Sequence, residues 1–431
     1  MNKIFKKISL VIILVILFVP LSAVEFQGLI FADYYGDIEP STNYENLRSR
    51  LYFQPVLSGS LFNYTVDFEL SGNLYYDPLG DPSFIEGENI LKEAYLSLPV
   101  GNFDFSIGQK ILSPGMVDVF SPLNNINSEY VYKLSLDDPY DSKRADLMVQ
   151  IQYYPNFDDS IQLVYVPFPR PDYEETRTVT MDSTGIDVDF LFGSDPYLTD
   201  SSNSFFISYN HMSSSFDLQF DYAWYTEQTP DFDLSELVDG PSLTGNVLPL
   251  YTKKHTFGGA YSTSFNGITL VEELAVNLTE DLDGTEIGIK NSDITLNSQI
   301  TGTLYGGTFA QLNIVYQHVI NYDQSGSVYS PSVDDQLIDE FNNYFNQPVQ
   351  NIAFFIGHLH NSFFREKLYL ALNVGFFFST DIYLAPRIAY TLSDEMKIEA
   401  GADIKTGEPS EYTLARGNLS DNYYVRLKFE Y

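Results

Sequence analysis

The chain contains no cysteine and only one tryptophan among its 431 residues. Without cysteine, neither a disulfide framework nor an acylated lipoprotein cysteine is available. Positive charge is also scarce, because 23 Lys and Arg face 58 Asp and Glu and give a formal net charge of −35. A chain this acidic is not expected to bind the phosphates of nucleic acids.

Long apolar runs are missing as well. The run from Leu10 to Val19 has ten residues, about half of the roughly 20 that a helix needs to cross a bilayer. Three lysines precede the run and Pro-Leu-Ser-Ala follows it, which is the pattern of a secretory signal. We therefore expect residues 1–23 to be a signal peptide that is cleaved after Ala23. The alternative is an N-terminal membrane anchor.

Tyrosine and phenylalanine are abundant, with 33 of each. Acidic chains that stay disordered are poor in aromatic residues, so this composition indicates a folded protein. Composition alone also allows a water-soluble β-sandwich.

Apolar and polar residues alternate along most of the chain. In residues 215–226, Phe216, Phe220 and Trp224 share one face, and aspartates and a glutamine share the other. Period two is typical of β-strands with one apolar face. We expect eighteen such strands, at about 25–35, 45–57, 61–76, 89–99, 102–111, 143–154, 158–168, 203–212, 215–226, 251–262, 267–279, 291–304, 308–320, 350–361, 364–378, 381–391, 395–405 and 421–431.

The connections between these strands alternate between tight turns and long loops, as they do in outer-membrane barrels. An even number of antiparallel strands lets the last strand pair with the first, so that no edge is left unpaired in lipid. The sequence therefore predicts that residues 24–431 form one all-β domain, a transmembrane antiparallel β-barrel of about 18 strands. Short turns are expected on the periplasmic side and long acidic loops on the outer side.

The final strand, NYYVRLKFEY, shows the pattern most clearly. Its odd positions are expected to face acyl chains and to carry the signal for insertion by the barrel-assembly machinery: Tyr423, Val425, Leu427, Phe429 and Tyr431. One segment fits badly, because strict alternation places Glu272 on the lipid face beside Glu273. A β-bulge would turn one of them inward.

Charged side chains at inward positions divide into two groups. The basic group is expected on one side of the lumen: Arg48, Arg50, Lys367, Arg387, Lys397, Lys405, Arg426 and Lys428. The acidic group is expected on the rest of the wall: Asp67, Glu69, Glu93, Asp104, Asp146, Asp217, Asp221 and Glu273. Opposed rows of charge would set an electric field across the pore. The alternative is that these charges pair locally across neighbouring strands.

The long connections hold 35 acidic and 5 basic residues, which places most of the negative charge outside the strands. Acidic loops at a channel mouth raise the local concentration of cations. Alternatively, they are solvated loops that like charge keeps from aggregating. The connection 112–142, with Asp118 and Glu129, either folds inward and narrows the lumen or folds outward as a surface loop.

Catalytic and metal-binding motifs are absent from the sequence: there is no G-x-S-x-G elbow, no H-E-x-x-H and no phosphate-binding glycine loop. We expect no enzyme activity, cofactor or metal. His358 and His360 share a strand face, which the alternation predicts to be the lipid face. The acidic segment Glu280–Glu286 lacks complete EF-hand spacing, and residues 333–345 are expected to form a short helix in an outer loop.

Residues 92–125, KEAYLSLPVGNFDFSIGQKILSPGMVDVFSPLNN, resemble the core of a porin-like family of outer-membrane proteins of uncharacterised function, related to alginate-export and phosphate-selective porins. A Glu-Ala-Tyr strand, a Gly-Asn-Phe turn and a Gly-Gln strand end carry the resemblance, together with YVPFPRP at 165–171. The resemblance implies an outer-membrane barrel and favours an inward pose for the loop that follows. It implies no ligand residue.

Barrels of 16 to 18 strands leave an aqueous channel, so we expect passive diffusion of small hydrophilic solutes through an outer-membrane pore. The expected partners are outer-membrane lipid, the barrel-assembly machinery and those solutes. The alternative is a barrel that does not transport, whose acidic loops act as an adhesin or interaction platform.

Overall fold

The computed structural model describes residues 21–37, 48–61, 65–76, 91–129, 143–172, 177–181, 186–190, 202–233, 246–286, 289–322, 349–377, 382–406 and 422–431. The expected helix at 333–345 and the residues before Leu21 lie outside this part. No helix within the described ranges is long and apolar enough to cross a membrane.

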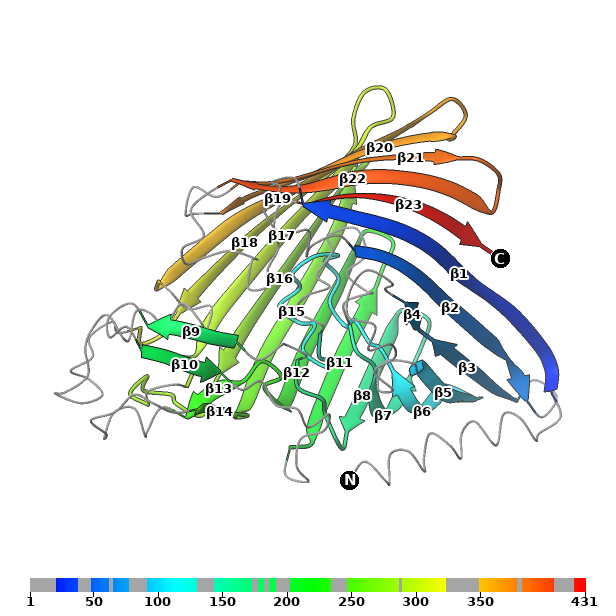
Figure 1. Cartoon of the computed structure of the whole chain (residues 1–431). Coiled ribbons are helices and arrows are strands. Elements are labelled where there is room, and N and C mark those ends of the chain that lie inside the picture. Colours follow the sequence, from blue (N-terminus) through cyan, green and yellow to red (C-terminus); the bar gives the residue numbers. More distant parts are fainter. Residues whose placement is uncertain are drawn as a thin grey trace.

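Within the described residues, eighteen rows of antiparallel strands form one closed barrel, which confirms the predicted barrel and the eighteen expected strands (Figure 1). The strands are β1 (Leu21–Asp37), β2 (Arg48–Leu61), β3 (Val66–Gly72), β4 (Leu74–Tyr76), β5 (Leu91–Val100), β6 (Phe103–Lys110), β7 (Asp146–Tyr153), β8 (Asp159–Val166), β11 (Ser204–Met212), β12 (Phe216–Thr226), β15 (Lys253–Phe265), β16 (Ile268–Leu278), β17 (Asp293–Thr303), β18 (Phe309–Val319), β19 (Asn351–Phe363), β20 (Leu368–Phe377), β21 (Ile382–Thr391), β22 (Met396–Thr406) and β23 (Asn422–Glu430). Strands β3 and β4 make one row, since both pair with β2 and are separated only at Asn73.

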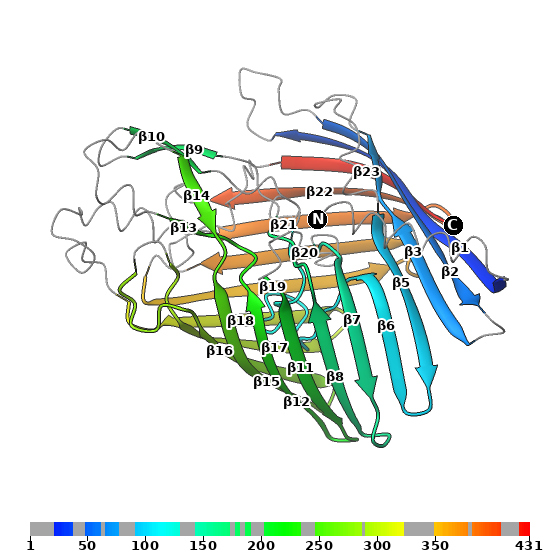
Figure 2. The same cartoon turned by 90° about the horizontal axis from the view of Figure 1, so that it is seen from below.

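The barrel closes where β1 pairs antiparallel with β23, from Leu29 opposite Glu430 to Asp37 opposite Asn422. The ring of strands is seen from below in Figure 2. Each row of strands thus has a partner on both sides, which removes the exposed edges of an open sheet. Because β1 begins at Leu21, cleavage after Ala23 would remove its first three residues; the signal peptide itself remains a prediction.

A second, four-stranded sheet lies beside one end of the barrel and was not expected from the sequence. It consists of β9 (Arg177–Met181), β10 (Ile186–Phe190), β13 (Asp231–Asp233) and β14 (Asn246–Leu250). These strands have three to five residues each, too short for alternation to stand out from the surrounding loops.

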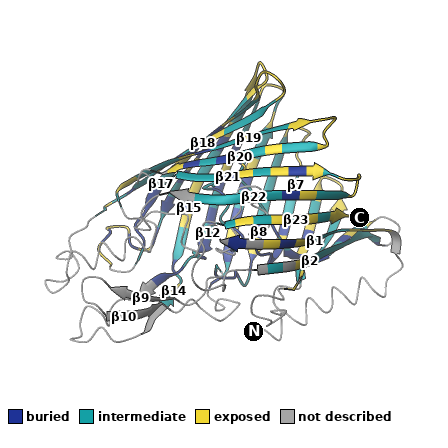
Figure 3. Cartoon of the chain, turned by 45° about the horizontal axis from the view of Figure 1, so that its top comes forward, coloured by how far each residue is buried: buried dark blue, intermediate teal, exposed yellow. Residues whose placement is uncertain are grey.

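The outer face of the barrel is apolar and the inner face is polar. Exposed side chains on consecutive strands include Phe220 on β12, Phe257 on β15 and Leu274 on β16, whereas Gln219, Thr256 and Asn297 are buried. Figure 3 shows exposed and buried residues alternating along single strands. This arrangement is the reverse of a soluble protein and matches a barrel with lipid outside and water within.

Glu272 and Glu273 follow the alternation without a bulge. The pairing of β16 with both neighbours is continuous, so Glu272 stays on the outer face and Glu273 points inward, where it is fully buried. The Ser298 hydroxyl on β17 donates a hydrogen bond to the Glu272 carboxylate. A neighbouring hydroxyl therefore partners the outward carboxylate, and no register shift is needed.

The C-terminal residue extends the final strand. The Tyr431 backbone exchanges two hydrogen bonds with Gly28, at 3.0 and 3.1 Å. Its ring lies among Phe26, Phe53 and Phe429, with centroid distances of 5.3 to 6.2 Å. A Cβ at Gly28 would lie within 2.8 Å of the Tyr431 ring, so the absence of a side chain at this position leaves room for the ring. The cluster forms part of an aromatic band at the rim of the barrel.

Candidate functional site

Residues 111–129 cross the interior of the barrel after β6. Their cyan trace lies within the ring of strands in Figure 2. Glu273 on β16 is the first contact on the wall: its carboxylate accepts hydrogen bonds from the backbone N–H groups of Met116 and Val117 and from the Ser121 hydroxyl. A carboxylate that accepts several N–H and O–H bonds makes charge-assisted contacts, which are stronger than neutral ones.

Amide side chains on β12 and β17 hold the same segment further along. Asn297 donates to the carbonyls of Val119 and Phe120, at 2.8 and 3.0 Å. Gln299 accepts from the Asp118 N–H and donates to its carboxylate, both at 2.9 Å. Gln219 donates to the Pro114 carbonyl at 2.8 Å. Inward amides, which would otherwise face water, serve here as partners for loop backbone.

The start of the loop is fixed by Asn127, which is 2 % exposed. Its carbonyl accepts the Leu112 N–H at 2.7 Å, and its amide donates to the carbonyls of Lys110 and Arg144, each at 3.0 Å. The same amide lies 3.4 Å from the Asp146 carboxylate. One side chain thus ties the beginning of the loop to its return at β7.

Apolar contacts complete the docking. Ile126 packs against a cluster on the inner wall that includes Met148, Val164 and Phe206. Leu123 packs against Ala260 and Ala275, and a Cβ added at Gly258 would lie 2.2 Å from its Cδ2. Apolar side chains therefore point inward where the loop covers the wall, because there they are removed from lumen water.

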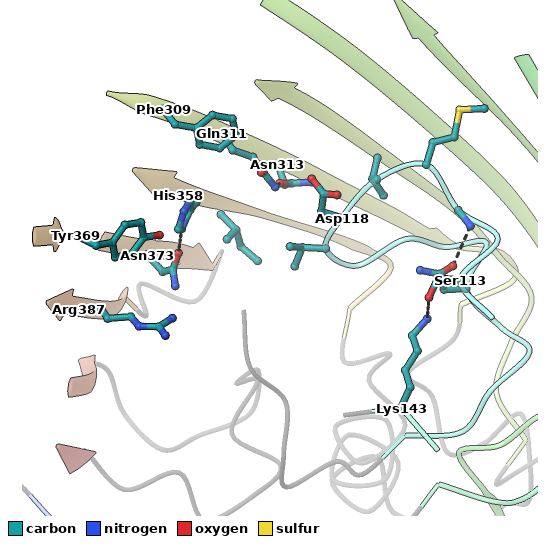
Figure 4. Close-up of a pocket in the computed structure, with 16 residues that line it drawn as sticks. Ser113, Asp118, Lys143, Phe309, Gln311, Asn313, His358, Tyr369, Asn373 and Arg387 are labelled. Carbon is teal, nitrogen blue, oxygen red and sulfur yellow. Dashed lines mark hydrogen bonds between the residues drawn. The ribbon is translucent and has the colours of Figure 1, made fainter. Parts of the chain in front are cut away.

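The opposite side of the loop faces a cavity of 420 Å³. Loop residues 113–119 line one side and strands β18 to β21 line the other, including Asn313, His358, Asn373 and Arg387 (Figure 4). Lys143 also reaches the cavity, where its ammonium donates to the Ser113 hydroxyl at 2.8 Å. Ten of its sixteen lining residues are polar or charged, so this cavity offers hydrogen-bond partners to a hydrophilic solute.

The acidic side chains expected on the wall lie on strands β3, β5, β6, β7, β12 and β16. Asp67 accepts from Ser60, Glu69 accepts from Tyr95, and Glu93 accepts from the Ile111 N–H. Asp104 and Asp217 are partly buried at the tight-turn end. Asp146 and Asp221 are 0 % and 7 % exposed, and Asp146 accepts the Arg170 N–H beneath the loop. These last two carboxylates are covered rather than open to the lumen.

Four of the described basic side chains pair with carboxylates, three of them across neighbouring strands and Lys428 within β23. Arg387 contacts Glu399 at 2.9 Å, and Arg426 contacts Asp33 at 3.2 Å. Lys428 and Lys397 approach Glu430 at 3.0 and 3.8 Å. Local pairing of this kind, the alternative considered above, weakens an opposed field across the lumen.

Of the remaining four positions of the basic set, one lies outside the wall and three lie on their expected strands. Lys367 lies exposed in the tight turn between β19 and β20 rather than in the wall, because β20 begins one residue later. The backbone of Arg50 pairs with Asp33 and that of Arg48 pairs with Tyr35, while Lys405 lies near the end of β22. The side chains of these last three residues are outside the described part.

The prediction that His358 and His360 face lipid is wrong. On β19, Phe355 and Leu359 are the exposed residues and Ile356 is buried, so the even positions point inward. His358 lines the cavity, and His360 stacks on Phe309 at 4.8 Å. The error has a physical cause: both faces of this strand are apolar in sequence, so the alternation does not distinguish them.

Ionisable groups at the base of the loop are shifted toward their neutral forms. Burial, helped by the Asp172 carboxylate, raises the pKa of Glu129 to about 7 even though Lys143 lies close. Burial lowers the pKa of Lys143 to about 8 against the opposing effect of Glu129. The two residues form an isolated β-bridge. Loss of hydration thus outweighs their mutual attraction.

Among the described residues, no group of three or more acidic, histidine or cysteine side chains could hold a metal ion. In the acidic segment Glu280–Glu286, the Asp281 carboxylate instead accepts the backbone N–H groups of Gly284, Thr285 and Glu286. Asp281 therefore shapes the turn.

Solved structures with a similar fold include a porin and an outer membrane protein. The structure is similar to a BenF-like porin from Pseudomonas fluorescens, with a TM-score of 0.55 and 10 % identity over 95 % of this chain and 99 % of that one. The outer membrane protein OpdK from Pseudomonas aeruginosa has a TM-score of 0.54 and 10 % identity over 96 % of this chain and 99 % of that one. OccK9 (OpdG) from the same species has a TM-score of 0.53 and 8 % identity over 95 % of this chain and 97 % of that one.

No family model matches the chain. No curated protein matches it either. At these identities the structural likeness shows the fold.

Proposed function

We propose that this chain is an outer-membrane channel through which small hydrophilic solutes diffuse passively, and that residues 111–129 set its size limit. One observation carries the proposal. A closed barrel, apolar outside and polar inside, holds a loop fixed across its interior and leaves a cavity of 420 Å³ beside that loop.

The size limit follows from the strand number and the loop together. A barrel of 16 to 18 strands encloses an aqueous lumen. The loop occupies one side of it and is held by Glu273, Asn297 and Gln299, so it is part of the wall rather than a free plug. Asp118 and Glu129 belong to this narrowed region, with Asp118 on the cavity and Glu129 at the loop base.

A preference for cations follows from where charge is left unbalanced. The basic side chains Arg387, Arg426 and Lys428 each have a carboxylate partner in the barrel wall. The long connections carry a large acidic excess in the sequence. Fields from acidic loops raise the local concentration of cations at a channel mouth, so we assign a weak cation preference to the pore rather than a strong opposed field.

Export and insertion belong to the same proposal. Residues 1–23 serve as the signal peptide, and the outward residues of β23, from Tyr423 to Tyr431, are read by the barrel-assembly machinery. Outer-membrane lipid then surrounds the apolar face. The resemblance of residues 92–125 supports a relation to alginate-export and phosphate-selective porins. We assign no catalytic activity, because the inward side chains of Glu273, Asn297 and Gln299 bind the loop.

Liposome swelling with sugars of graded size tests the proposal. Proteoliposomes should swell with small sugars and progressively less with larger ones. A folded barrel that admits no sugar of any size would overturn the channel, and loop-dependent binding of a host ligand by that barrel would favour the adhesin. Heat-modifiable mobility on a gel confirms that the protein is folded in each preparation.

A further inference from the structure

The inner wall of β19 carries two histidines whose ring nitrogens face each other. The Nε2 atom of His358 and the Nδ1 atom of His360 are 2.9 Å apart. The residues are two apart on one strand and therefore share a face. The face is the inner one, because Ile356 is buried and Leu359 is exposed.

Neighbouring side chains orient both rings. The side-chain carbonyl of Asn373 on β20 accepts a hydrogen bond from the His358 Nδ1 atom. This nitrogen therefore carries the hydrogen, and the Nε2 atom keeps a lone pair. His360 stacks on Phe309 at a centroid distance of 4.8 Å, and the tilted ring of Tyr369 lies 5.3 Å from it. A carbonyl bonded to the second nitrogen of an imidazole is the usual outer contact of a metal-binding histidine.

The two nitrogens share an N–H···N hydrogen bond, which sets their separation of 2.9 Å. Once the bridging hydrogen has left, a rotation of the rings can turn both lone pairs toward one ion about 2.0 Å from each nitrogen. Tetragonal sites with nitrogen ligands are typical of Cu²⁺ and Ni²⁺, and Cu²⁺ binds more tightly.

We propose that His358 and His360 form a binding site for Cu²⁺, and more weakly for Ni²⁺ and Zn²⁺, inside the barrel. On binding, the hydrogen of the His360 Nδ1 atom moves through water to its Nε2 atom, so that both facing nitrogens present lone pairs and no net proton is released. His358 borders the 420 Å³ cavity, which lets water or a solute carboxylate fill the remaining positions on the ion (Figure 4).

The ion would reach this site through the lumen, after passing the long connections between the strands, which are acidic. Bound there, it would add positive charge beside the cavity. The site does not require that the barrel conduct sugars, so its test is separate from the test of the channel.

Equilibrium dialysis and electron paramagnetic resonance of the folded, detergent-solubilised barrel with Cu²⁺ test this proposal. One ion should bind per chain, with a spectrum that shows two imidazole nitrogens. Affinity should fall by at least about tenfold in His358→Asn and in His360→Asn, and by about 10- to 100-fold in Asn373→Ala, which removes the outer contact. Mg²⁺ in excess should not compete.

His318→Asn is the matched control. His318 lies on β18 and hydrogen-bonds with Asn351, away from the pair, so Cu²⁺ binding should not change. A wild-type protein that binds no Cu²⁺, or whose spectrum lacks imidazole nitrogens, overturns the proposal without any variant. So does a folded His358→Asn, His360→Asn double variant that binds as tightly as the wild type.

Discussion

Asp33 and Arg426, 393 positions apart in the sequence, lie directly opposite each other where the barrel closes. The guanidinium Nη2 atom is 3.2 Å from the Asp33 carboxylate, whose side chain is fully buried. Phe31 and Tyr424 flank the guanidinium carbon at 4.4 and 5.4 Å. The ion pair therefore joins the first and last strands and sits between two rings.

Asp33→Ala should destabilise the barrel, because it leaves the Arg426 charge half-buried without its carboxylate. Removing one partner of a buried pair costs about 3 to 5 kcal/mol, and the partial exposure of Arg426 favours the low end of that range. Urea unfolding in lipid vesicles measures the loss. The double variant Asp33→Leu, Arg426→Met should recover part of it; an equal or larger loss in the double variant would contradict the assignment.

Glu273→Ala should loosen the loop, since the N–H groups of Met116 and Val117 lose their acceptor. Each unsatisfied buried group costs about 1 to 3 kcal/mol. Asn297 and Gln299 still hold the loop, so we expect a noisier open channel and a larger size limit rather than unfolding. Single-channel recordings measure both properties.

Glu272→Gln is the matched control, because it changes the adjacent carboxylate on the outer face. Its conductance and size limit should equal those of the wild type. If Glu272→Gln altered the current as Glu273→Ala does, the assignment of the two faces would fail.

Gly258→Ala should displace the loop at Leu123. An added Cβ would lie 2.2 Å from the Leu123 Cδ2 atom, and because Leu123 is 1 % exposed, its side chain has little room to turn away. Increased protease cleavage within residues 116–128 is the expected result. Gly357→Ala, whose nearest contact would be 3.9 Å, should behave like the wild type. Equal cleavage of both variants would show that Leu123 does not fill this position.

Ion selectivity should change with pH. The pKa of Glu129 is raised to about 7 and that of Lys143 is lowered to about 8. From pH 6 to pH 9 the first group gains a negative charge and the second loses a positive one, so both changes favour cations. The cation-to-anion permeability ratio, from reversal potentials in planar bilayers, should rise over this interval.

Two variants separate the contributions. Glu129→Gln should remove the rise in the cation-to-anion permeability ratio near pH 7. Lys143→Met should remove the rise near pH 8. A wild-type ratio that stays constant with pH, or variants that keep both rises, would show that these groups do not titrate beside the permeation path.

The barrel could be predicted from sequence because the alternation of apolar and polar residues along each strand identifies its outer and inner faces. Closure followed from the even number of strands, and the apolar odd positions of the last strand, such as Val425, are exposed in the structure. Glu272 also lies where strict alternation places it. These features depend on neighbours along one strand, which a single sequence contains.

The interior could be predicted less well, because it depends on contacts between distant segments. Met148 and Val164 point inward since Ile126 covers them, so the inner wall is not uniformly polar. Asp146 was expected to line the lumen but lies beneath the loop. The inward position of His358 was also missed, because Ile356 makes the inner face of β19 as apolar in sequence as its outer face.

Thiol labelling during current recording tests the central claim most directly, because the chain has no cysteine and each introduced one is the only thiol. We compare Asp118→Cys, on the loop at the cavity, with Val425→Cys, exposed on the outer face of β23. A charged, water-soluble thiosulfonate should reduce the current through Asp118→Cys and leave Val425→Cys unchanged. No effect at Asp118→Cys, or an equal effect at both positions, would contradict a water-filled lumen narrowed by residues 111–129.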